Sequence, residues 1–307
     1  MKILVLGGGG FIGFHLVNDL VAAGHVVKVL GRNRVPSRPL LPDVQYISGD
    51  LADSKLLRDA LQDVDAVAHL ASGTVPATAD KDPGRDIQIN LLGTLSVLDD
   101  MAACGVKRLL YVSSGGTVYG KPQEIPIPEG HILDPISSYG IVKVAIESYL
   151  KLYETKFGLR PIVIRASNPY GPYQGNLGVQ GIIGTYLNRA LNQQPLEIWG
   201  DGSAIRDYIY IKDLTSLCVA ALESEKIGIY NGGSGTGTSV SHIAEVISEV
   251  VGSPIPIIYK PARSLDVPIS VLDIERAKLD FNWDTKIGLR EGVASVWSWL
   301  KANHAAS

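Results

Sequence analysis

Cysteine, histidine and charge are all scarce in this chain, and each scarcity excludes a class of protein. The 307 residues include 2 Cys and 6 His, and the net charge is −3. Two cysteines cannot build the disulfide framework of a small secreted protein, and the scattered histidines lack metal-ligand spacing. The balanced charge offers no basic field to nucleic acid or to an anionic membrane. We therefore expect a cytoplasmic protein with no metal and no nucleic-acid or membrane partner.

Long apolar runs, repeats and linkers are missing as well. No apolar run is long enough to span a bilayer, and an apolar run that starts next to Lys2 leaves no room for a signal peptide. The chain contains 46% hydrophobic and 19% charged residues, a balance typical of a well-buried enzyme. The length suits one large α/β domain with an added lobe, or two domains.

The chain opens with a strand, a glycine turn and a helix. Residues 3–6 are predicted to form a short buried strand, four glycines follow from Gly7 to Gly10, and residues 11–21 have helical apolar spacing. Glycine permits the tight turn and the close approach of a pyrophosphate, whose charge the free helix amides bind. The spacings Gly8-x-Gly10-x-x-Gly13 and Gly7-x-x-Gly10-x-x-Gly13 both fit, and both predict a dinucleotide cofactor.

Strand and helix patterns then alternate through the first half of the chain. Strands are predicted at residues 3–6, 26–30, 44–48, 66–70, 108–112 and 161–164, and helices at 53–61, 86–104 and 138–157. This alternation predicts an α/β fold, a Rossmann-type doubly wound parallel sheet. Helices at 182–192, 213–222, 241–251, 274–279 and 289–300 and strands near 196–199 and 208–211 follow a Gly- and Pro-rich stretch. We expect a dinucleotide-binding domain over residues 1–168 and, over 169–307, mainly a smaller substrate-binding lobe with some segments returning to the sheet.

Tyr139 and Lys143 are four residues apart near the start of a predicted helix, so their side chains share one face. An ammonium group near a phenol favours the phenolate, so we expect a lowered pKa of Tyr139 and an acid–base role. The same spacing is common on solvated helix faces. Here it follows a glycine turn and a serine-rich strand end, from Ser113 to Gly120, and this conjunction favours a catalytic pair.

Taken in order, the motifs resemble those of the extended short-chain dehydrogenase/reductase family, and within it the NAD-dependent epimerases and dehydratases of nucleotide sugars. Several together are specific, although no single one is, and they favour the wider glycine spacing. The matching motifs are Gly7-x-x-Gly10-Phe11-Ile12-Gly13, Gly49-Asp50-Leu51, His69-Leu70-Ala71, Asn90-x-x-Gly93-Thr94, Ser113-Ser114 with Val118-Tyr119-Gly120, Tyr139-x-x-x-Lys143, Arg165-x-x-Asn168-x-Tyr170-Gly171-Pro172, Gly200-Asp201-Gly202 with Arg206-Asp207-Tyr208, and Arg263-Ser264-Leu265-Asp266.

The resemblance implies a role for each matching position. The positions that would bind NAD or NADP are Gly7, Gly10, Phe11, Ile12, Gly13, Arg32, Asp50, Leu51, Leu70, Ala71, Ser72, Asn90, Ser113, Tyr139 and Lys143. The positions that would bind the nucleotide sugar are Asn168, Gln180, Gly181, Arg206, Arg263 and Asp266. Tyr139 and Lys143 would be catalytic, together with Ser114 or Thr117. The alternative for Arg206 is an ordinary surface ion pair with Asp207.

The chain departs from the family pattern in two places. Gly115 stands where relatives usually carry a Ser or Thr that bridges substrate and tyrosine, so Ser114 or Thr117 would have to substitute, or the substrate would be met differently. Gly31 and Arg32 follow the second strand where NAD-using relatives carry an acid for the ribose hydroxyls. An arginine attracts a 2′-phosphate, which favours NADP, whereas the alternative is that Arg32 is a solvated loop charge.

The resemblance therefore implies a nucleotide-sugar 4-epimerase of the UDP-hexose type, with Tyr139 as acid and base and hydride passing transiently to bound NAD(P). An NADPH-dependent nucleotide-sugar 4-ketoreductase and a catalytically inactive nucleotide-binding protein remain as alternatives. The substrate would be linked to UDP or dTDP. A homodimer that packs through the helices at residues 86–104 and 138–157 is expected from the same resemblance.

Overall fold

A parallel sheet forms the centre of the molecule. The computed structural model describes residues 1–32, 38–174, 181–262 and 267–304. Its 7-stranded sheet has the order β10-β6-β5-β4-β1-β2-β3, and each pair of neighbours is parallel. The strands are β1 (Lys2–Leu6), β2 (Val26–Gly31), β3 (Gln45–Ser48), β4 (Ala66–His69), β5 (Arg108–Ser114), β6 (Arg160–Ala166) and β10 (Gly228–Gly232). The prediction of a doubly wound parallel sheet is confirmed.

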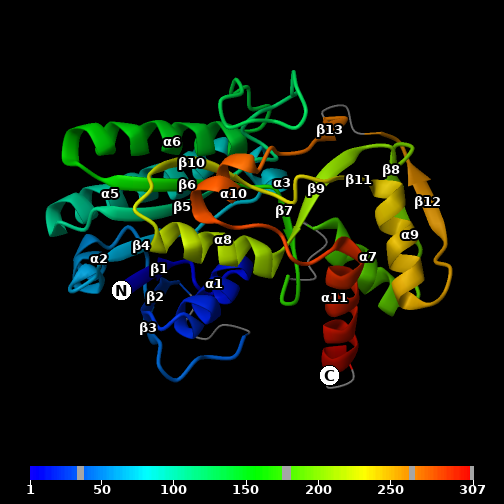
Figure 1. The fold of residues 1–307 in the computed structure, drawn as a ribbon, viewed down its shortest axis with the longest axis horizontal. Helices are drawn as coiled ribbons and strands as arrows, with labels where there is room; N and C mark the ends of the chain where they lie inside the picture. Colours follow the sequence, from blue (N-terminus) through cyan, green and yellow to red (C-terminus); the bar gives the residue numbers. More distant parts are fainter. Residues whose placement is uncertain (33–37, 175–180, 263–266, 305–307) are drawn as a thin grey trace.

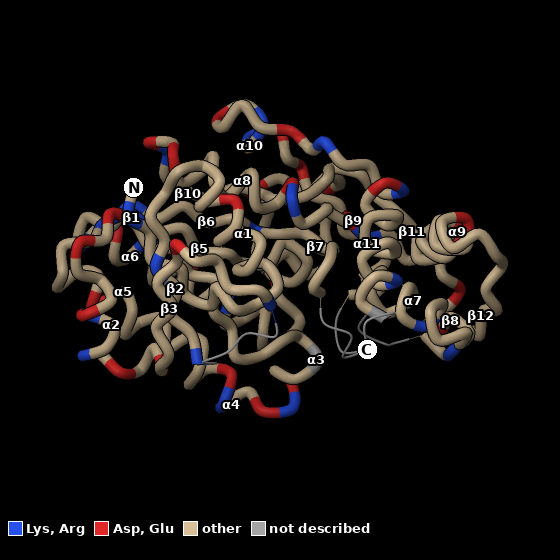
Figure 2. Tube along the Cα trace, turned by 90° about the horizontal axis from the view of Figure 1, so that it is seen from below, with Lys and Arg blue, Asp and Glu red and all other residues tan. Residues whose placement is uncertain are grey.

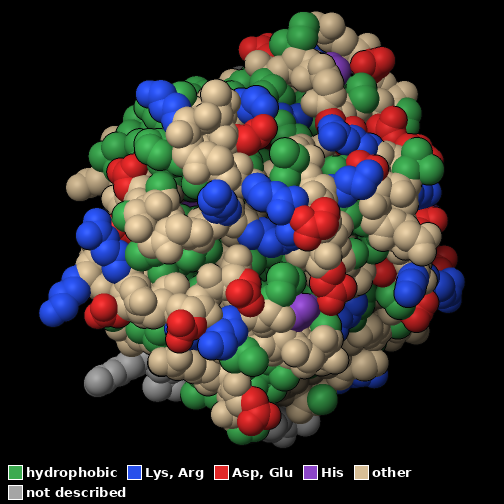
Figure 3. Space-filling model, turned by 60° about the vertical axis from the view of Figure 1, so that its left-hand side comes forward, with side chains coloured by type: hydrophobic (Ala, Val, Ile, Leu, Met, Phe, Trp, Pro, Cys, Tyr) green, Lys and Arg blue, Asp and Glu red, His purple; other side chains and the backbone are tan. Residues whose placement is uncertain are grey.

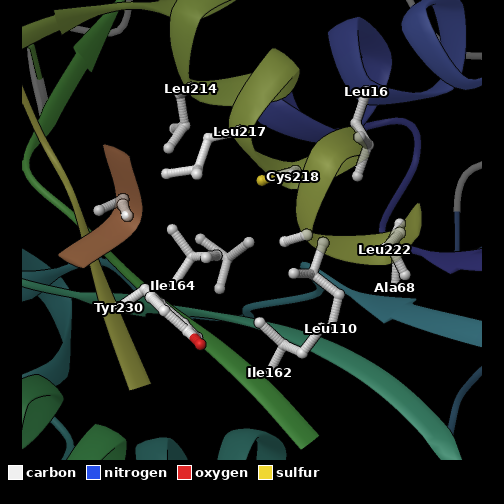
Figure 4. Close-up of a cluster of buried hydrophobic side chains, with 14 of the residues drawn as sticks. Leu16, Ala68, Leu110, Ile162, Ile164, Leu214, Leu217, Cys218, Leu222 and Tyr230 are labelled. Carbon is white, nitrogen blue, oxygen red and sulfur yellow. The ribbon is translucent and has the colours of Figure 1, made fainter. Parts of the chain in front are cut away.

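Helices cover both faces of this sheet (Figure 1). On one face lie α1 (Phe11–Ala22), α8 (Ile211–Glu223) and α10 (Glu275–Phe281), and on the other lie α2 (Ser54–Leu61), α5 (Gly93–Cys104) and α6 (Ser138–Phe157). Figure 4 shows how Leu214, Leu217 and Cys218 of α8 face Leu110 and Ile164 of the sheet. These residues are fully buried, so they remove apolar surface from water and fix α8 against the strands.

The segment that leads into α5 differs from the single helix predicted over residues 86–104. After the short α3 (Pro76–Ala79), the chain forms α4 (Pro83–Asp86), a π-helical segment η1 (Ile87–Leu92) and then α5. A π-helical segment shifts the side chains that follow it and is frequent at functional sites, and apolar periodicity cannot reveal one. Asn90 lies within this segment. Asp53 caps α2, since its side chain accepts from the Leu56 amide at 3.1 Å.

The rest of the chain builds a smaller lobe beside the sheet, seen on the right in Figures 1 and 2. Its elements are β7 (Asn168–Tyr170), α7 (Ile182–Leu191), β8 (Leu196–Trp199), β9 (Ile205–Tyr210), β11 (Gly237–Ser239), α9 (Val240–Val251), β12 (Ile257–Lys260), β13 (Ile269–Ser270) and α11 (Leu289–His304). Ile183, Leu196, Ile243 and Val293 help form its separate apolar core. β10 is a strand of the main sheet, and α8 and α10 pack against that sheet, so these segments beyond residue 168 lie with it. The domain boundary at residue 168 stays a prediction.

The surface mixes charges of both signs. On the face drawn in Figure 3, Lys and Arg side chains lie beside Asp and Glu side chains. Among the ion pairs, Arg160 meets Glu225 at 2.7 Å and Lys226 meets Asp280 at 2.7 Å. In the described ranges we find no helix whose length and apolar character would let it cross a membrane.

Candidate active site

A cleft of about 2200 Å³ lies at the carboxyl ends of β1, β4 and β5 and extends to the smaller lobe. Open parallel sheets bind ligands at this edge. Most of the predicted site residues line it together: Gly7, Gly10, Phe11, Ile12, Gly13, Arg32, Asp50, Leu51, Leu70, Ala71, Ser72, Asn90, Ser113, Ser114, Thr117, Tyr139, Lys143, Asn168 and Gly181. Arg206 is not among the lining residues. Gln180, Arg263 and Asp266 fall outside the described residues.

The glycine turn is packed so closely that side chains cannot replace its hydrogens at two positions. A Cβ on Gly13 would lie 2.3 Å from the Gly7 carbonyl oxygen, and a Cβ on Gly7 would lie 2.7 Å from the Ala71 nitrogen. Gly9, in contrast, has nothing within 4 Å of a Cβ position and is exposed. The turn therefore packs against α1 and against the segment that follows β4 on one side, and its backbone is open on the other side.

This open side fits the pyrophosphate of a nicotinamide dinucleotide. Gly10 caps α1 without any side-chain hydrogen bond, and the first turn of the helix carries no acidic residue. The first amides of a helix are left without intrahelical partners and favour an anion. Further along the cleft, Asp50 is exposed and accepts from the Ala52 amide at 3.0 Å. The residues present thus match the cofactor class that the glycine spacing predicts.

Tyr139 and Lys143 lie one turn apart on α6 with the Lys143 ammonium 5.5 Å from the centre of the Tyr139 ring. The expected lowering of the Tyr139 pKa is wrong for this structure. Burial raises the pKa of Tyr139 to about 12, the negative charge of Asp86 adds to the rise, and a hydrogen bond with Ser72 opposes it. The Lys143 ammonium lies over the face of the Tyr139 ring and donates to the Val112 carbonyl at 2.9 Å, and it is not hydrogen-bonded to the phenol oxygen.

The lysine is itself tuned by its surroundings. Burial lowers the pKa of Lys143 to about 8, while the carboxylates of Glu147 and Asp86 act in the opposite direction. Glu147 lies one turn beyond Lys143 and forms a buried ion pair with Arg165, with 2.6 Å between Oε2 and Nη2. Tyr139, Lys143 and Glu147 therefore follow one stripe of α6 from the cleft into the interior. Their spacing of four residues was a signal that could have identified Glu147.

Asp86 is a second site residue that the motifs did not reveal. It is fully buried, and its Oδ1 accepts from Thr74 Oγ1 and from Asn90 Nδ2, both at 2.6 Å. Its Oδ2 accepts from the Ser138 hydroxyl at 2.8 Å, directly beside Tyr139. Asn90 also accepts from the Gly73 amide at 2.8 Å. The network joins the loop after β4 to the helix that carries Tyr139, and the position of Asp86 four residues before Asn90 is its only sequence signal.

The residues at and after the serine-rich end of β5 face different partners. The Ser113 hydroxyl donates to Glu147 Oε1 at 2.6 Å, so it serves the buried ion pair. Thr117 Oγ1 lies 3.5 Å from the Ser114 carbonyl. A Cβ on Gly115 would lie 2.6 Å from the Leu272 side chain and 3.1 Å from the Arg165 carbonyl oxygen. Position 115 therefore faces packed protein in this chain, and a longer side chain there would collide with Leu272.

The substrate side of the cleft is partly organised. Asn168 lines it and donates from Nδ2 to the Asp207 carbonyl at 2.8 Å, and Gly181, with φ +88°, caps α7. The alternative of a surface ion pair between Arg206 and Asp207 is wrong. Asp207 is buried and accepts from Ser234 and Leu272, whereas the Arg206 guanidinium donates to the Ile205 carbonyl at 2.9 Å.

Comparison with known proteins places this geometry among sugar-nucleotide enzymes. The model of the NAD dependent epimerase/dehydratase family matches residues 3–233. A UDP-glucose 4-epimerase of Corynebacterium glutamicum is 32% identical over 329 residues, which covers 100% of this chain and 99% of the relative. The Thermotoga maritima UDP-glucose 4-epimerase structure with UDP-glucose has a TM-score of 0.95 at 32% identity, with 99% and 100% coverage. The Thermus thermophilus enzyme with NAD has a TM-score of 0.91 at 32% identity, covering 98% of this chain and 99% of that one.

Proposed function

Because the chain belongs to the NAD dependent epimerase/dehydratase family, we propose that it is a nucleotide-sugar 4-epimerase acting on UDP-hexoses. The observation that carries the proposal is the meeting of the glycine turn with the Tyr139–Lys143 pair in one cleft. A bound nicotinamide dinucleotide would supply the acceptor and donor for hydride. The residues of the chain do the rest: Tyr139 takes the proton of the 4-hydroxyl and returns it, while the cleft holds the keto sugar through its rotation.

The test is epimerisation of UDP-galactose and UDP-glucose by the purified protein and by Tyr139→Phe. The variant keeps the ring and loses the proton carrier, so we expect kcat to fall about 100-fold or more. Tyr149→Phe is the matched control, because Tyr149 lies on the same helix and does not line the cleft. Activity of Tyr139→Phe close to that of the parent would refute the assignment.

A 4-ketoreductase is the second candidate, and Gly115 and Arg32 are the observations that favour it. A reductase consumes its cofactor, whereas an epimerase regenerates it in each cycle. Stoichiometric oxidation of NADPH by a 4-keto nucleotide sugar would identify a reductase. Catalytic interconversion of two sugars with no net change in cofactor absorbance would identify the epimerase.

For the cofactor, we propose that NADP binds at least as well as NAD. Gly31 ends β2, and a Cβ there would meet nothing within 4 Å, which leaves room for a 2′-phosphate. Arg32 is exposed and lines the cleft, and its guanidinium has no partner within the described ranges. We expect Arg32→Glu to reverse the preference in a binding titration, and Lys55→Glu on α2 to leave it unchanged. An unaltered NADP-to-NAD ratio in Arg32→Glu would mean that Arg32 is only a solvated charge.

We also propose a homodimer through α5 and α6. Exposed apolar side chains support this interface, among them Ile141 at 56% and Phe157 at 50% exposure on α6. Light scattering should give twice the chain mass, and Ile141→Glu should give the single mass. A monomeric parent protein would remove the proposal.

We propose that UDP or dTDP carries the sugar. Mass spectrometry of the ligands that co-purify with the protein tests this directly.

We also propose that the protein works in the cytoplasm. Cys104 and Cys218 are both free thiols, which suits the reducing cytoplasm. Recovery of the protein outside the cytoplasmic fraction of its own cells would contradict that location.

A further inference from the structure

Residues 72–90, between β4 and the middle of η1, form one side of the cleft, and we call them the cleft wall. Thr74, Val75 and Arg85 are among the residues of this wall that line the cleft. Its helices α3 and α4 have only 4 residues each. Helices this short are marginal by themselves, so the shape of the wall depends on side-chain hydrogen bonds.

Asp86 is the buried acceptor at the centre of these hydrogen bonds. Its Oδ1 accepts from the Thr74 hydroxyl and from the Asn90 amide, both at 2.6 Å. Asn90 also donates to Thr74 Oγ1 at 2.6 Å and accepts from the Gly73 amide at 2.8 Å. Asn90 is therefore engaged through both its nitrogen and its oxygen, and one oxygen of Asp86 holds the two ends of the wall together.

The second oxygen of Asp86 binds the helix that carries Tyr139. Oδ2 accepts from the Ser138 hydroxyl at 2.8 Å, and the Ser138 amide donates to Asp80 at 2.7 Å. Ser138 is the first residue of α6 and precedes Tyr139 directly. Two carboxylates of the cleft wall thus bind the start of α6, where the free amides of a helix favour negative charge.

We propose that Asp86 is a positioning residue that fixes Tyr139 against the cleft wall. This inference rests on the proposed epimerase function. Proton and hydride transfer require the Tyr139 oxygen and the cleft to keep their separation, and a misplacement of about 1 Å can lower a rate about 100-fold. Because one carboxylate holds both the wall and α6, its removal frees one relative to the other. The expected result is slower chemistry with little change in substrate binding.

The hydrogen bonds of Asp86, and not its charge, carry this role. Burial raises the pKa of Tyr139 most, and the charge of Asp86 adds to the rise, so this charge opposes the phenolate. An asparagine at position 86 would accept from Thr74 and Asn90 through its oxygen. Its amide would donate to the Ser138 hydroxyl, which can turn to accept. Alanine would keep none of these contacts, so the two substitutions separate positioning from electrostatics.

The test compares Asp86→Ala and Asp86→Asn with the parent, using kcat and KM for UDP-galactose at a temperature where all three are folded. We expect Asp86→Ala to lower kcat about tenfold or more and to leave KM within about twofold. Asp86→Asn should keep kcat within about threefold of the parent value. Ser138→Ala breaks only the bond to α6 and should lower kcat by an intermediate factor.

Asp100 provides the matched control. It is 2% exposed and accepts from the Ser54 hydroxyl at 2.8 Å, but it does not line the cleft. Asp100→Ala therefore removes a buried carboxylate of the same kind. We expect this variant to be less stable than the parent and to keep the parent kcat.

Hydrogen exchange followed by mass spectrometry tests the same link without turnover, because it reports the local opening of backbone amides. Asp86→Ala should speed exchange in peptides that cover residues 72–76 and 137–141, whereas Asp86→Asn and Asp100→Ala should leave both at the parent rate. If the parent turns over no nucleotide sugar, the proposed function fails, while the exchange rates still decide whether Asp86 joins the cleft wall to α6.

An unchanged kcat in Asp86→Ala would overturn the inference. Equal losses of kcat in Asp86→Asn and Asp86→Ala would overturn it too, because the charge would then be responsible. A similar loss in Asp100→Ala would reduce the effect to general destabilisation and reject the positioning role. If Asp86→Ala does not fold, Ser138→Ala against Ser138→Thr decides, since threonine keeps the hydroxyl; equal kcat values in these two variants would contradict the proposal.

Discussion

Glu147 offers a direct measure of what the buried charges below the site contribute. Arg165 and Glu147 have side chains only 2% and 4% exposed, with 2.6 Å between Nη2 and Oε2. Arg165 Nε also lies 3.2 Å from both carboxylate oxygens, and Ser113 donates to Oε1 at 2.6 Å. In Glu147→Gln, the amide group would face donors, and the Arg165 charge would stay buried without a counter-charge.

Removing one partner of such a pair costs about 3–5 kcal/mol, because the remaining charge is desolvated and unpaired. The chain contains a matched control. Arg160 and Glu225 make the same pair at 2.7 Å, but their side chains are 42% and 80% exposed. Solvent screens this pair, so Glu225→Gln should lower the free energy of unfolding far less than Glu147→Gln does.

The assay is urea unfolding of both variants at pH 7, with the parent protein alongside. Equal losses for Glu147→Gln and Glu225→Gln would refute the argument from burial. The double variant Glu147→Leu with Arg165→Met should recover part of the loss, because no charge is then left unpaired. A further loss in the double variant would show that packing around Glu147, and not its charge, is responsible.

Two further predictions concern the glycine turn and the catalytic lysine. Gly13→Ala should abolish dinucleotide binding and lower thermal stability, because its Cβ would lie 2.3 Å from a backbone oxygen, whereas Gly9→Ala should fold like the parent; equal melting temperatures would contradict this. The pKa of Lys143 falls from 10.5 to about 8 on folding, so between these values the unfolded chain binds more protons and stability rises with pH. Relative to Lys143→Met, the parent should therefore gain about 3 kcal/mol between pH 8 and 10.5 in denaturant titrations; a flat difference would contradict this.

The sheet and the catalytic pair were predictable because their signals are local. A few consecutive residues are enough to predict a buried strand, such as the one that contains Leu109-Leu110, or the glycine turn. The helix α6 begins and ends where the spacing predicts, from Ser138 to Phe157. The π-helical segment at Ile87–Leu92 was not predictable, because its apolar pattern is that of an ordinary helix. The difference matters for function, since this segment places Asn90, and the end of α4 places Asp86, against the loop that follows β4.

The error over the Tyr139 pKa has the same origin. Spacing on a helix says that Lys143 is near Tyr139, but the sign of the shift depends on burial and on Asp86, which is distant in the sequence. Gly115 likewise reads as a missing hydroxyl until Leu272, more than a hundred residues away, is seen to pack against it. A motif therefore identifies which group carries the proton, whereas the residues that set its pKa arrive from other elements. In this chain burial of the phenol comes first and the carboxylate of Asp86 adds to it, so a relative that shares the Tyr-x-x-x-Lys motif but lacks an acidic residue at the position of Asp86 should have a tyrosine with a lower pKa.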